Sequence, residues 1–269
     1  MSSLLARTLR RLFSFRRTKP STDPVVSAPS APQLTYDRAQ GTVALRHEFY
    51  GDLRLFANDP AISQHLLDGR TIWEEYLVAQ FARHFPVGRN VIDAGANLGL
   101  HSIALAKLAK HGEKVFAFEP HPEIFPLTQS NCAAYPNVRC IPQAASDTRH
   151  TVYMNSIHGL SNQAGADVHE QGDDSMFAVP AVPIDSLDLP DIGLMKIDVE
   201  HHEIECIRGA RETIRRDKPI LFVEVYGGHD IATAPPEIAA EIRARIQFIC
   251  DLGYDAQCLH VHDYLFTPR

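Results

Sequence analysis

From residue 90 onward, short apolar runs alternate with segments in which apolar residues recur at helical spacing. A short apolar run is typical of a buried strand, and an apolar residue at every third or fourth position is typical of a helix. The pattern therefore predicts strands at Asn90–Ala94, Lys114–Phe118, Val138–Ala144, Gly193–Val199 and Ile220–Val225. It predicts helices at Gly99–Lys110, Pro122–Ala134, Glu203–Arg216 and Pro236–Cys250. Such alternation favours an α/β fold with a doubly wound, mostly parallel sheet and helices on both faces.

Three further segments complete this region. Thr151–Met154 is expected to add an antiparallel strand, and Tyr254–Phe266 to form a C-terminal antiparallel hairpin. Residues 155–180 are polar and rich in glycine, which predicts a long loop over a site, with Ser161 and Asn162 contacting a substrate.

The chain before residue 90 is expected to form two parts. Residues 1–35 combine a basic tail with a Pro-rich linker, which predicts disorder. Residues 36–89 are expected to form an extension of the main domain at 90–269, with a hairpin at 42–57 around Gly51-Asp52 and a helix from Thr71 to Phe85.

Charge is distributed unevenly along the chain. The net charge is −7, and residues 1–19 carry six basic and no acidic side chains, so the remainder carries −7 − 6 = −13. An acidic body argues against a nucleic-acid partner, because phosphate binding needs a basic surface. For residues 1–19 three interpretations stay open: a peripheral membrane contact through an amphipathic helix, an organellar transit peptide, or a solvated tail.

The five cysteines include no C-x-x-C pair, which favours a reducing compartment. No apolar run in the sequence is long enough to span a bilayer. We therefore expect a cytoplasmic protein. The sequence does not indicate its oligomeric state.

Candidate chemistry lies at the strand ends, where an open α/β sheet binds its ligands. The first strand runs into a turn that holds Asp93, Gly95, Ala96, Asn97 and Gly99. The second strand ends in Glu119 and Pro120, which places a carboxylate where it could bind two ribose hydroxyls. The third strand is followed by Ser146 and Asp147, where an adenine edge would lie.

A nicotinamide-dependent oxidoreductase is the main alternative at this turn. Its G-x-G-x-x-G motif holds a pyrophosphate at the helix N-terminus. Here Asn97 occupies the position of the second glycine, and Asp93 would repel the pyrophosphate. A cofactor with an ammonium group and no phosphate suits Asp93 better, and S-adenosylmethionine is such a cofactor.

The fourth strand ends in a group of titratable residues that faces the expected acceptor side. Transfer to a hydroxyl benefits from a general base or a metal. Asp198 is the strongest candidate base, with Glu200 and His202 as further catalytic candidates and His201 beside them. These residues could also ligate a divalent metal, but no fixed-spacing signature such as H-E-x-x-H is present, so we predict no metal site.

The motifs together resemble those of the FkbM family of methyltransferases. The matching stretches are Trp73-Glu74, Val91–Gly99, Phe118–Pro120, Ala144–Asp147, Ile184–Leu187, Lys196–Glu200, Arg208–Ala210 and Pro219–Val225. The resemblance implies a class I methyltransferase fold over residues 90–269 and O-methylation of sugar or natural-product hydroxyls. The family usually has Gly after the glutamate of its post-strand motif, whereas this chain has His201.

The sequence thus predicts an S-adenosylmethionine-dependent O-methyltransferase with a small-molecule or glycan acceptor. Two alternatives remain: a nicotinamide-dependent oxidoreductase and a non-catalytic, methyltransferase-like binding module.

Overall fold

The computed structural model describes residues 34–69, 72–157, 167–225 and 231–269. Residues 1–19, and with them the expected membrane contact, lie outside the described residues, as do Ser161 and Asn162. The chain forms two compact units, with the boundary between His84 and Phe85. Among the described residues, no helix is both long enough and apolar enough to cross a membrane.

The first unit contains a small antiparallel sheet and two helices. Its strands β1 (Thr35–Asp37), β2 (Thr42–His47) and β3 (Gly51–Phe56) pair in that order. Helices α2 (Ile62–Gly69) and α3 (Glu75–His84) follow. The hairpin expected at 42–57 is confirmed, and β1 extends it with residues that begin inside the predicted linker.

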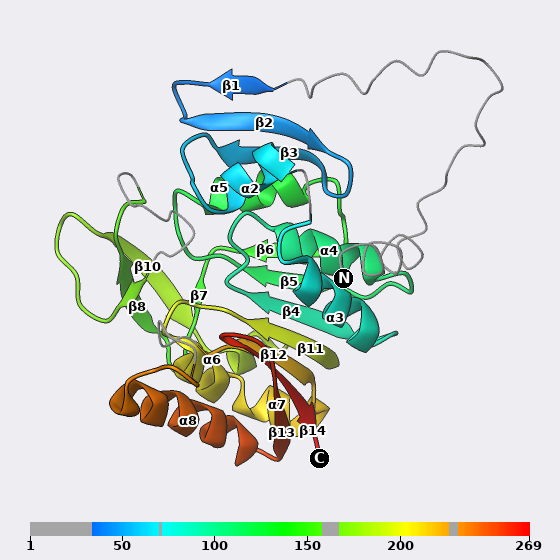
Figure 1. Cartoon of the computed structure of the whole chain (residues 1–269), viewed down its shortest axis with the longest axis vertical. Helices are drawn as coiled ribbons and strands as arrows, with labels where there is room; N and C mark the ends of the chain where they lie inside the picture. The colour runs from blue at the N-terminus through cyan, green and yellow to red at the C-terminus, as the bar shows by residue number, and fades with distance from the viewer. Residues whose placement is uncertain (1–33, 70–71, 158–166, 226–230) are drawn as a thin grey trace. The chain divides into compact units, whose positions relative to one another are not determined.

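The second unit is built on a seven-stranded sheet with the order β13-β14-β12-β11-β4-β5-β6. Figure 1 shows these strands side by side, with the C-terminal hairpin at one end of the sheet. The strands are β4 (Asn90–Ala94), β5 (Val115–Phe118), β6 (Val138–Ile141), β11 (Ile192–Ile197), β12 (Ile220–Glu224), β13 (Tyr254–His260) and β14 (Asp263–Pro268). Pairing from β6 to β12 is parallel, and β14 is antiparallel to both neighbours.

The order of the strands reverses between β4 and β11. From β4 the chain proceeds outward through α4 (Leu100–Leu108) and α5 (Phe125–Cys132) to β6. From β11 it proceeds in the opposite direction through α6 (Glu203–Gly209), α7 (Arg211–Asp217) and α8 (Pro236–Cys250). Right-handed crossovers in opposite directions place the two sets of helices on opposite faces. The predicted doubly wound α/β fold is therefore confirmed, and its switch point lies beside Asp93 and Asp198.

The expectation of one long loop at 155–180 is wrong, as is that of a third strand reaching Ala144. Strands β7 (Ala144–Ala145), β8 (His150–Met154), β9 (Val168–His169) and β10 (Phe177–Val182) form a second sheet in the order β7-β10-β8-β9. The burial pattern along β10 shows why: the buried Val179 and Ala181 alternate with the exposed Ala178 and Pro180, as in a half-buried strand.

The predicted helix 203–216 is divided into α6 and α7 at Ala210. The short 3-10 helix η1 (Ile184–Leu187) supplies the reason, because the carboxylate of Asp185 accepts hydrogen bonds from the backbone N–H groups of Glu212 and Thr213 at 2.8 Å each. A side chain from another element thus caps the start of α7.

Candidate active site

The turn after β4 is held by left-handed backbone conformations at Gly95, Asn97 and Gly99, with φ of +80°, +48° and +81°. A Cβ atom at Gly95 would lie 1.7 Å from the carbonyl oxygen of Asp198, and one at Gly99 would lie 2.7 Å from the sulfur of Cys132. Only glycine fits both positions. The turn is therefore in direct contact with the strand end that carries the acidic group.

All five backbone N–H groups of residues 95–99 are already used inside the protein. Those of Gly95 and Ala96 donate to the carbonyl of Phe118, that of Asn97 to Glu119, that of Leu98 to the side chain of Asn97, and that of Gly99 to the carbonyl of Ala96. A pyrophosphate site needs free amides directed at the ligand. None of the five amides of this turn is left for a phosphate, which argues against a dinucleotide.

Glu119 closes the turn from the end of β5. Its Oε2 accepts from the N–H of Asn97 and its Oε1 from the N–H of His121, both at 2.8 Å. Burial raises the pKa of Glu119 to about 7, against these two hydrogen bonds. A carboxylate has about four lone-pair sites, so two remain for hydroxyl donors. These two acceptor sites of Glu119 therefore fit the two hydroxyl donors of a ribose diol.

The carboxylate of Asp93 contacts side chains, whereas that of Glu119 contacts backbone amides. Asp93 is fully buried, and its Oδ2 accepts a hydrogen bond from Ser102 at 2.5 Å. Its Oδ1 lies 3.6 Å from the Lys196 ammonium and accepts no hydrogen bond among the described residues. Burial raises the pKa of Asp93, while Lys196 and Ser102 oppose the rise. The carboxylate of Asp93 thus contacts Ser102 and Lys196 in the interior of the protein. Its predicted contact with a cofactor ammonium stays a prediction.

Asp198 lies two residues after Lys196 and is less buried. Its Oδ2 is 2.8 Å from the Lys196 ammonium, and 31% of its side chain is exposed. It is also hydrogen-bonded to Glu224 at the end of β12. Burial acts to raise the pKa of Asp198, but Lys196 and the bond from Glu224 outweigh it, so the pKa is lowered. Asp198 is therefore an ionised carboxylate that is partly exposed to solvent.

Glu200 and His201 form the turn between β11 and α6, both in the left-handed region with φ of +48° and +71°. Non-glycine residues in this region concentrate at functional sites. Glu200 is partly buried and makes no hydrogen bond or ion pair with the described residues. Burial and, secondly, the charge of Asp198 raise its pKa to about 8. A carboxylate that titrates near neutral pH is suited to accept a proton.

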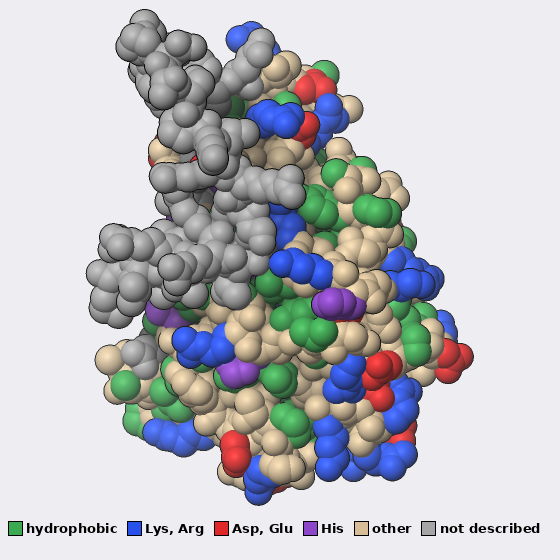
Figure 2. All heavy atoms as spheres, turned by 90° about the vertical axis from the view of Figure 1, so that its right-hand side faces the viewer, with side chains coloured by type: hydrophobic (Ala, Val, Ile, Leu, Met, Phe, Trp, Pro, Cys, Tyr) green, Lys and Arg blue, Asp and Glu red, His purple; other side chains and the backbone are tan. Residues whose placement is uncertain are grey.

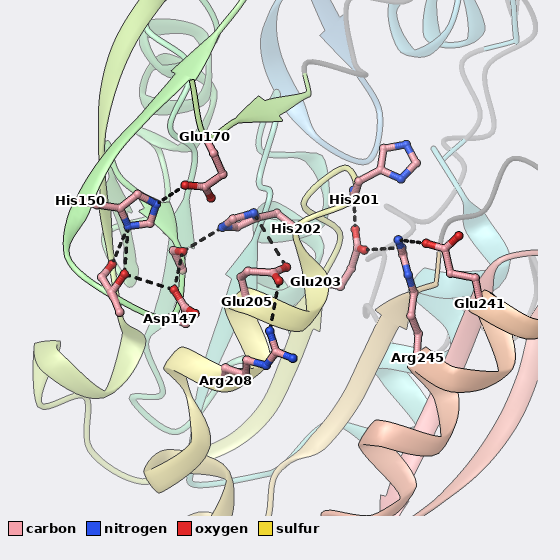
Figure 3. Close-up of polar contacts among 12 residues, drawn as sticks. Asp147, His150, Glu170, His201, His202, Glu203, Glu205, Arg208, Glu241 and Arg245 are labelled. Carbon is pink, nitrogen blue, oxygen red and sulfur yellow. Dashed lines mark hydrogen bonds and ion pairs between the residues drawn. The ribbon is translucent and has the colours of Figure 1, made fainter. Parts of the chain in front are cut away.

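The close-up in Figure 3 shows that His202 points toward the end of β7, while the His201 ring is directed away from these contacts. Nε2 of His202 lies 2.9 Å from the buried hydroxyl of Ser146, and burial lowers the pKa of His202. The hydroxyls of Ser146 and Thr148 donate to Asp147. His202 thus connects the acidic strand end to the predicted adenine edge, and its predicted catalytic role stays a prediction.

Within the part of the chain that the structure describes, no group of three or more His, Cys, Asp or Glu side chains is arranged to hold a metal ion. In the lower part of the face drawn in Figure 2, Lys and Arg side chains lie among Asp and Glu side chains.

Two residues at this edge, Lys196 and Glu224, were part of the matched motifs but received no role from the sequence. Lys196 is 3% exposed, and its ammonium also donates to the carbonyl of Gly95 at 2.9 Å. The spacing in the sequence could have predicted the role of Lys196. Lys196 precedes Asp198 by two residues at the end of a strand, so both side chains lie on one face. Glu224 ends an apolar strand, as Glu119 does.

Comparison with known proteins identifies the family. The model of the methyltransferase FkbM domain matches residues 93–256. A curated hexuronic acid methyltransferase, AglP of Haloferax volcanii, is 25% identical over an alignment of 146 residues that covers 51% of this chain. The chain spans about half of that relative, 56% of its length.

Two solved structures are also similar to this chain. A methyltransferase FkbM from Methylobacillus flagellatus aligns at 16% identity and a TM-score of 0.48, covering 66% of this chain and 43% of its own. Fibrillarin from Aeropyrum pernix, with S-adenosylmethionine bound, aligns at 12% identity and a TM-score of 0.44, covering 87% and 96%. Since the family model covers more than half of the sequence, the chain belongs to the FkbM family of S-adenosylmethionine-dependent methyltransferases.

Proposed function

We propose that this methyltransferase acts on a hydroxyl group, that of a sugar or glycan. The observation that supports this most directly is the contact of Asp198 with the glycine turn, with Glu200 two residues further along the same strand end. A hydroxyl must lose its proton during transfer, and a carboxylate at the strand end is suited to receive it. The similarity to a hexuronic acid methyltransferase supports a carbohydrate as acceptor.

The residues of the turn would hold the cofactor. S-adenosylmethionine, when bound, supplies a methyl group on a sulfonium that nucleophiles attack. Glu119 would accept from the ribose hydroxyls, and Ser146 and Asp147 would border the adenine, while Gly95, Ala96, Asn97, Gly99 and Pro120 shape the backbone around it. Asp198 and Glu200 would orient the acceptor hydroxyl in line and take its proton.

A panel of methyl glycosides tests this proposal. The full chain is incubated with S-adenosylmethionine labelled at the methyl group and with neutral hexosides, hexuronic acids and amino sugars in separate reactions. We expect labelled O-methyl ether in at least one neutral or uronic sugar, identified by mass spectrometry and NMR. Label found only on the amino group of amino sugars would contradict an O-directed reaction, and binding of cofactor without transfer to any member would favour a binding module.

A further inference from the structure

The register of three neighbouring strands places four charged residues in one row. In the pairing of β4 with β11, Asp93 lies opposite Lys196. In the pairing of β11 with β12, Ile197 lies opposite Val223, so the next residues along, Asp198 and Glu224, also lie side by side. Successive side chains of a strand alternate between faces, and therefore Lys196 and Asp198 share one face.

Contacts along this row alternate between donors and acceptors. Ser102 donates to Asp93, Lys196 lies between Asp93 and Asp198 at 3.6 and 2.8 Å, and Asp198 is hydrogen-bonded to Glu224. The row connects α4, β4, β11 and β12. Asp93 and Lys196 are shielded from solvent, with side-chain exposures of 0% and 4%, whereas Asp198 is 31% exposed. Asp198 and the partly buried Glu224 are thus the members of the row that are open to solvent, and of these Asp198 contacts the glycine turn.

The contact between Asp198 and Glu224 joins two carboxyl groups, so one of them must carry a proton. Asp198 faces the Lys196 ammonium of β11, Glu224 on β12 and His101 on α4. The acids Asp93, Glu200 and Glu203 also lie near it, but of these groups only Lys196 forms an ion pair with it. Glu224 faces three acids: Asp198, Glu200 and, across the pairing with β14, Asp263. Burial and, next, the charge of Asp198 raise the pKa of Glu224 to about 11. The proton therefore resides on Glu224.

We propose that Glu224 is a positioning residue for methyl transfer: as a neutral carboxylic acid, it donates a hydrogen bond to Asp198 and, with Lys196, holds that carboxylate ionised and directed at the acceptor. The role in transfer depends on the proposed function. The chemistry is that of an acid kept neutral by its surroundings so that it can donate. Asp198, fixed between a cation and a donor, accepts a hydrogen bond from the acceptor hydroxyl and orients it, and the strained neighbour Glu200 is left to take the proton.

Carboxyl NMR on the full chain tests the proposal without an acceptor. Aspartate and glutamate are labelled with ¹³C at the side-chain carboxyl, and the two signals are assigned with Asp198→Asn and Glu224→Gln. We expect Glu224 to remain protonated from pH 4 to pH 8 and Asp198 to titrate below an ordinary aspartate. Glu224→Leu removes the donor and should raise the pKa of Asp198 by about one or more, while Glu224→Gln, which keeps a neutral donor, should raise it less than half as much.

Glu212→Gln on the exposed face of α7 serves as the control for a lost carboxylate and should leave the pKa of Asp198 unchanged. Titration of Glu224 near an ordinary glutamate in the wild-type protein would overturn the proposal, even if Glu224→Leu does not fold. The proposal would also be overturned if Glu224→Gln raised the pKa of Asp198 as much as Glu224→Leu does. Binding of S-adenosylhomocysteine to the same preparation reports on the proposed function separately, because its loss would leave the two carboxyl titrations unaffected.

Discussion

Two acidic residues at adjacent strand ends, Asp93 and Glu119, differ in their surroundings although the sequence assigned both to the cofactor. Glu119 binds two backbone amides and keeps lone pairs for a ligand, while Asp93 is fully buried against Ser102 and Lys196. We therefore expect substitutions at the two positions to affect different properties, cofactor affinity for Glu119 and stability for Asp93.

Affinity for S-adenosylhomocysteine should depend on pH through Glu119. Its pKa is raised to about 7 by burial, and hydroxyl donors of a bound ribose favour the ionised form. Below that pKa, binding must release a proton, so affinity should rise up to about tenfold per pH unit between pH 6 and 7 and level off above pH 8. Calorimetry across this range measures the effect. Glu119→Gln should bind more weakly and show no such dependence; the same pH profile in both proteins would exclude Glu119 from the ribose site.

Asp93→Asn should act chiefly on folding. Removing one partner of a buried ion pair leaves the Lys196 ammonium undercompensated, at a cost of roughly 3–5 kcal/mol. Asp52→Asn is a matched control, because Asp52 pairs with Arg46 at 2.8 Å where both side chains are more than three-quarters exposed. Loss of that pair should cost less than about 1 kcal/mol. Denaturant unfolding compares the two variants, and equal losses of stability would contradict the structural role of Asp93.

At the scale of elements, the close approach of α6 to the end of β7 makes a specific prediction. A Cβ atom at Gly209 would lie 1.8 Å from the carbonyl oxygen of Ser146, so Gly209→Ala must displace backbone. Overpacking of this kind lowers the free energy of unfolding by about 1–3 kcal/mol. Helix propensity alone predicts the opposite, an increase of about 1 kcal/mol in the free energy of unfolding, because alanine favours a helix more than glycine does. An increase in the free energy of unfolding, measured with denaturant, would show that α6 does not pack as described.

Elements with a clear period could be predicted from the sequence, and those defined by distant partners could not. Pro236–Cys250 is a helix with the predicted bounds, and the strand at Asn90–Ala94 has the predicted ones as well. In contrast, β7 departs from the main sheet because Ala144 and Ala145 pair with β10, some thirty-seven residues further along, and no local pattern reports that pairing. The division between α6 and α7 likewise depends on Asp185 from η1.

In the candidate site, too, local position could be predicted from the sequence and distant partners could not. Position at a strand end was enough to select Asp93, Glu119, Asp198 and Glu200. The partner of each could not be predicted, because the register that sets Lys196 between two carboxylates and Glu224 beside Asp198 arises only when the strands pair.

For the whole molecule, the partly buried Glu200 and Glu224 predict that stability falls with rising pH above neutral. Burial raises the pKa of Glu200 to about 8 and that of Glu224 to about 11. Between pH 7 and 9 the folded protein retains protons that the unfolded chain, with ordinary glutamate pKa values, has released, so stability is lost as pH rises. His101, whose pKa burial lowers to about 3, acts in the opposite direction only below about pH 6.5.

The Tm should therefore decline from pH 7 to pH 9 in the wild-type protein and decline less in Glu200→Gln, which has no carboxyl group to ionise. Differential scanning calorimetry at several pH values measures this. A Tm that rises over the same interval, or identical slopes for the two proteins, would show that Glu200 is not held in its protonated form.

The central claim, that the turn from Gly95 to Gly99 serves S-adenosylmethionine and not a dinucleotide, is tested most directly by titrating the full chain with S-adenosylhomocysteine and with NAD⁺ in the calorimeter. Because the amides of the turn are all used within the protein and Glu119 keeps lone pairs for a ribose, we predict saturable, one-to-one binding of S-adenosylhomocysteine and no saturable heat with NAD⁺. Binding of NAD⁺ without binding of S-adenosylhomocysteine would contradict the account.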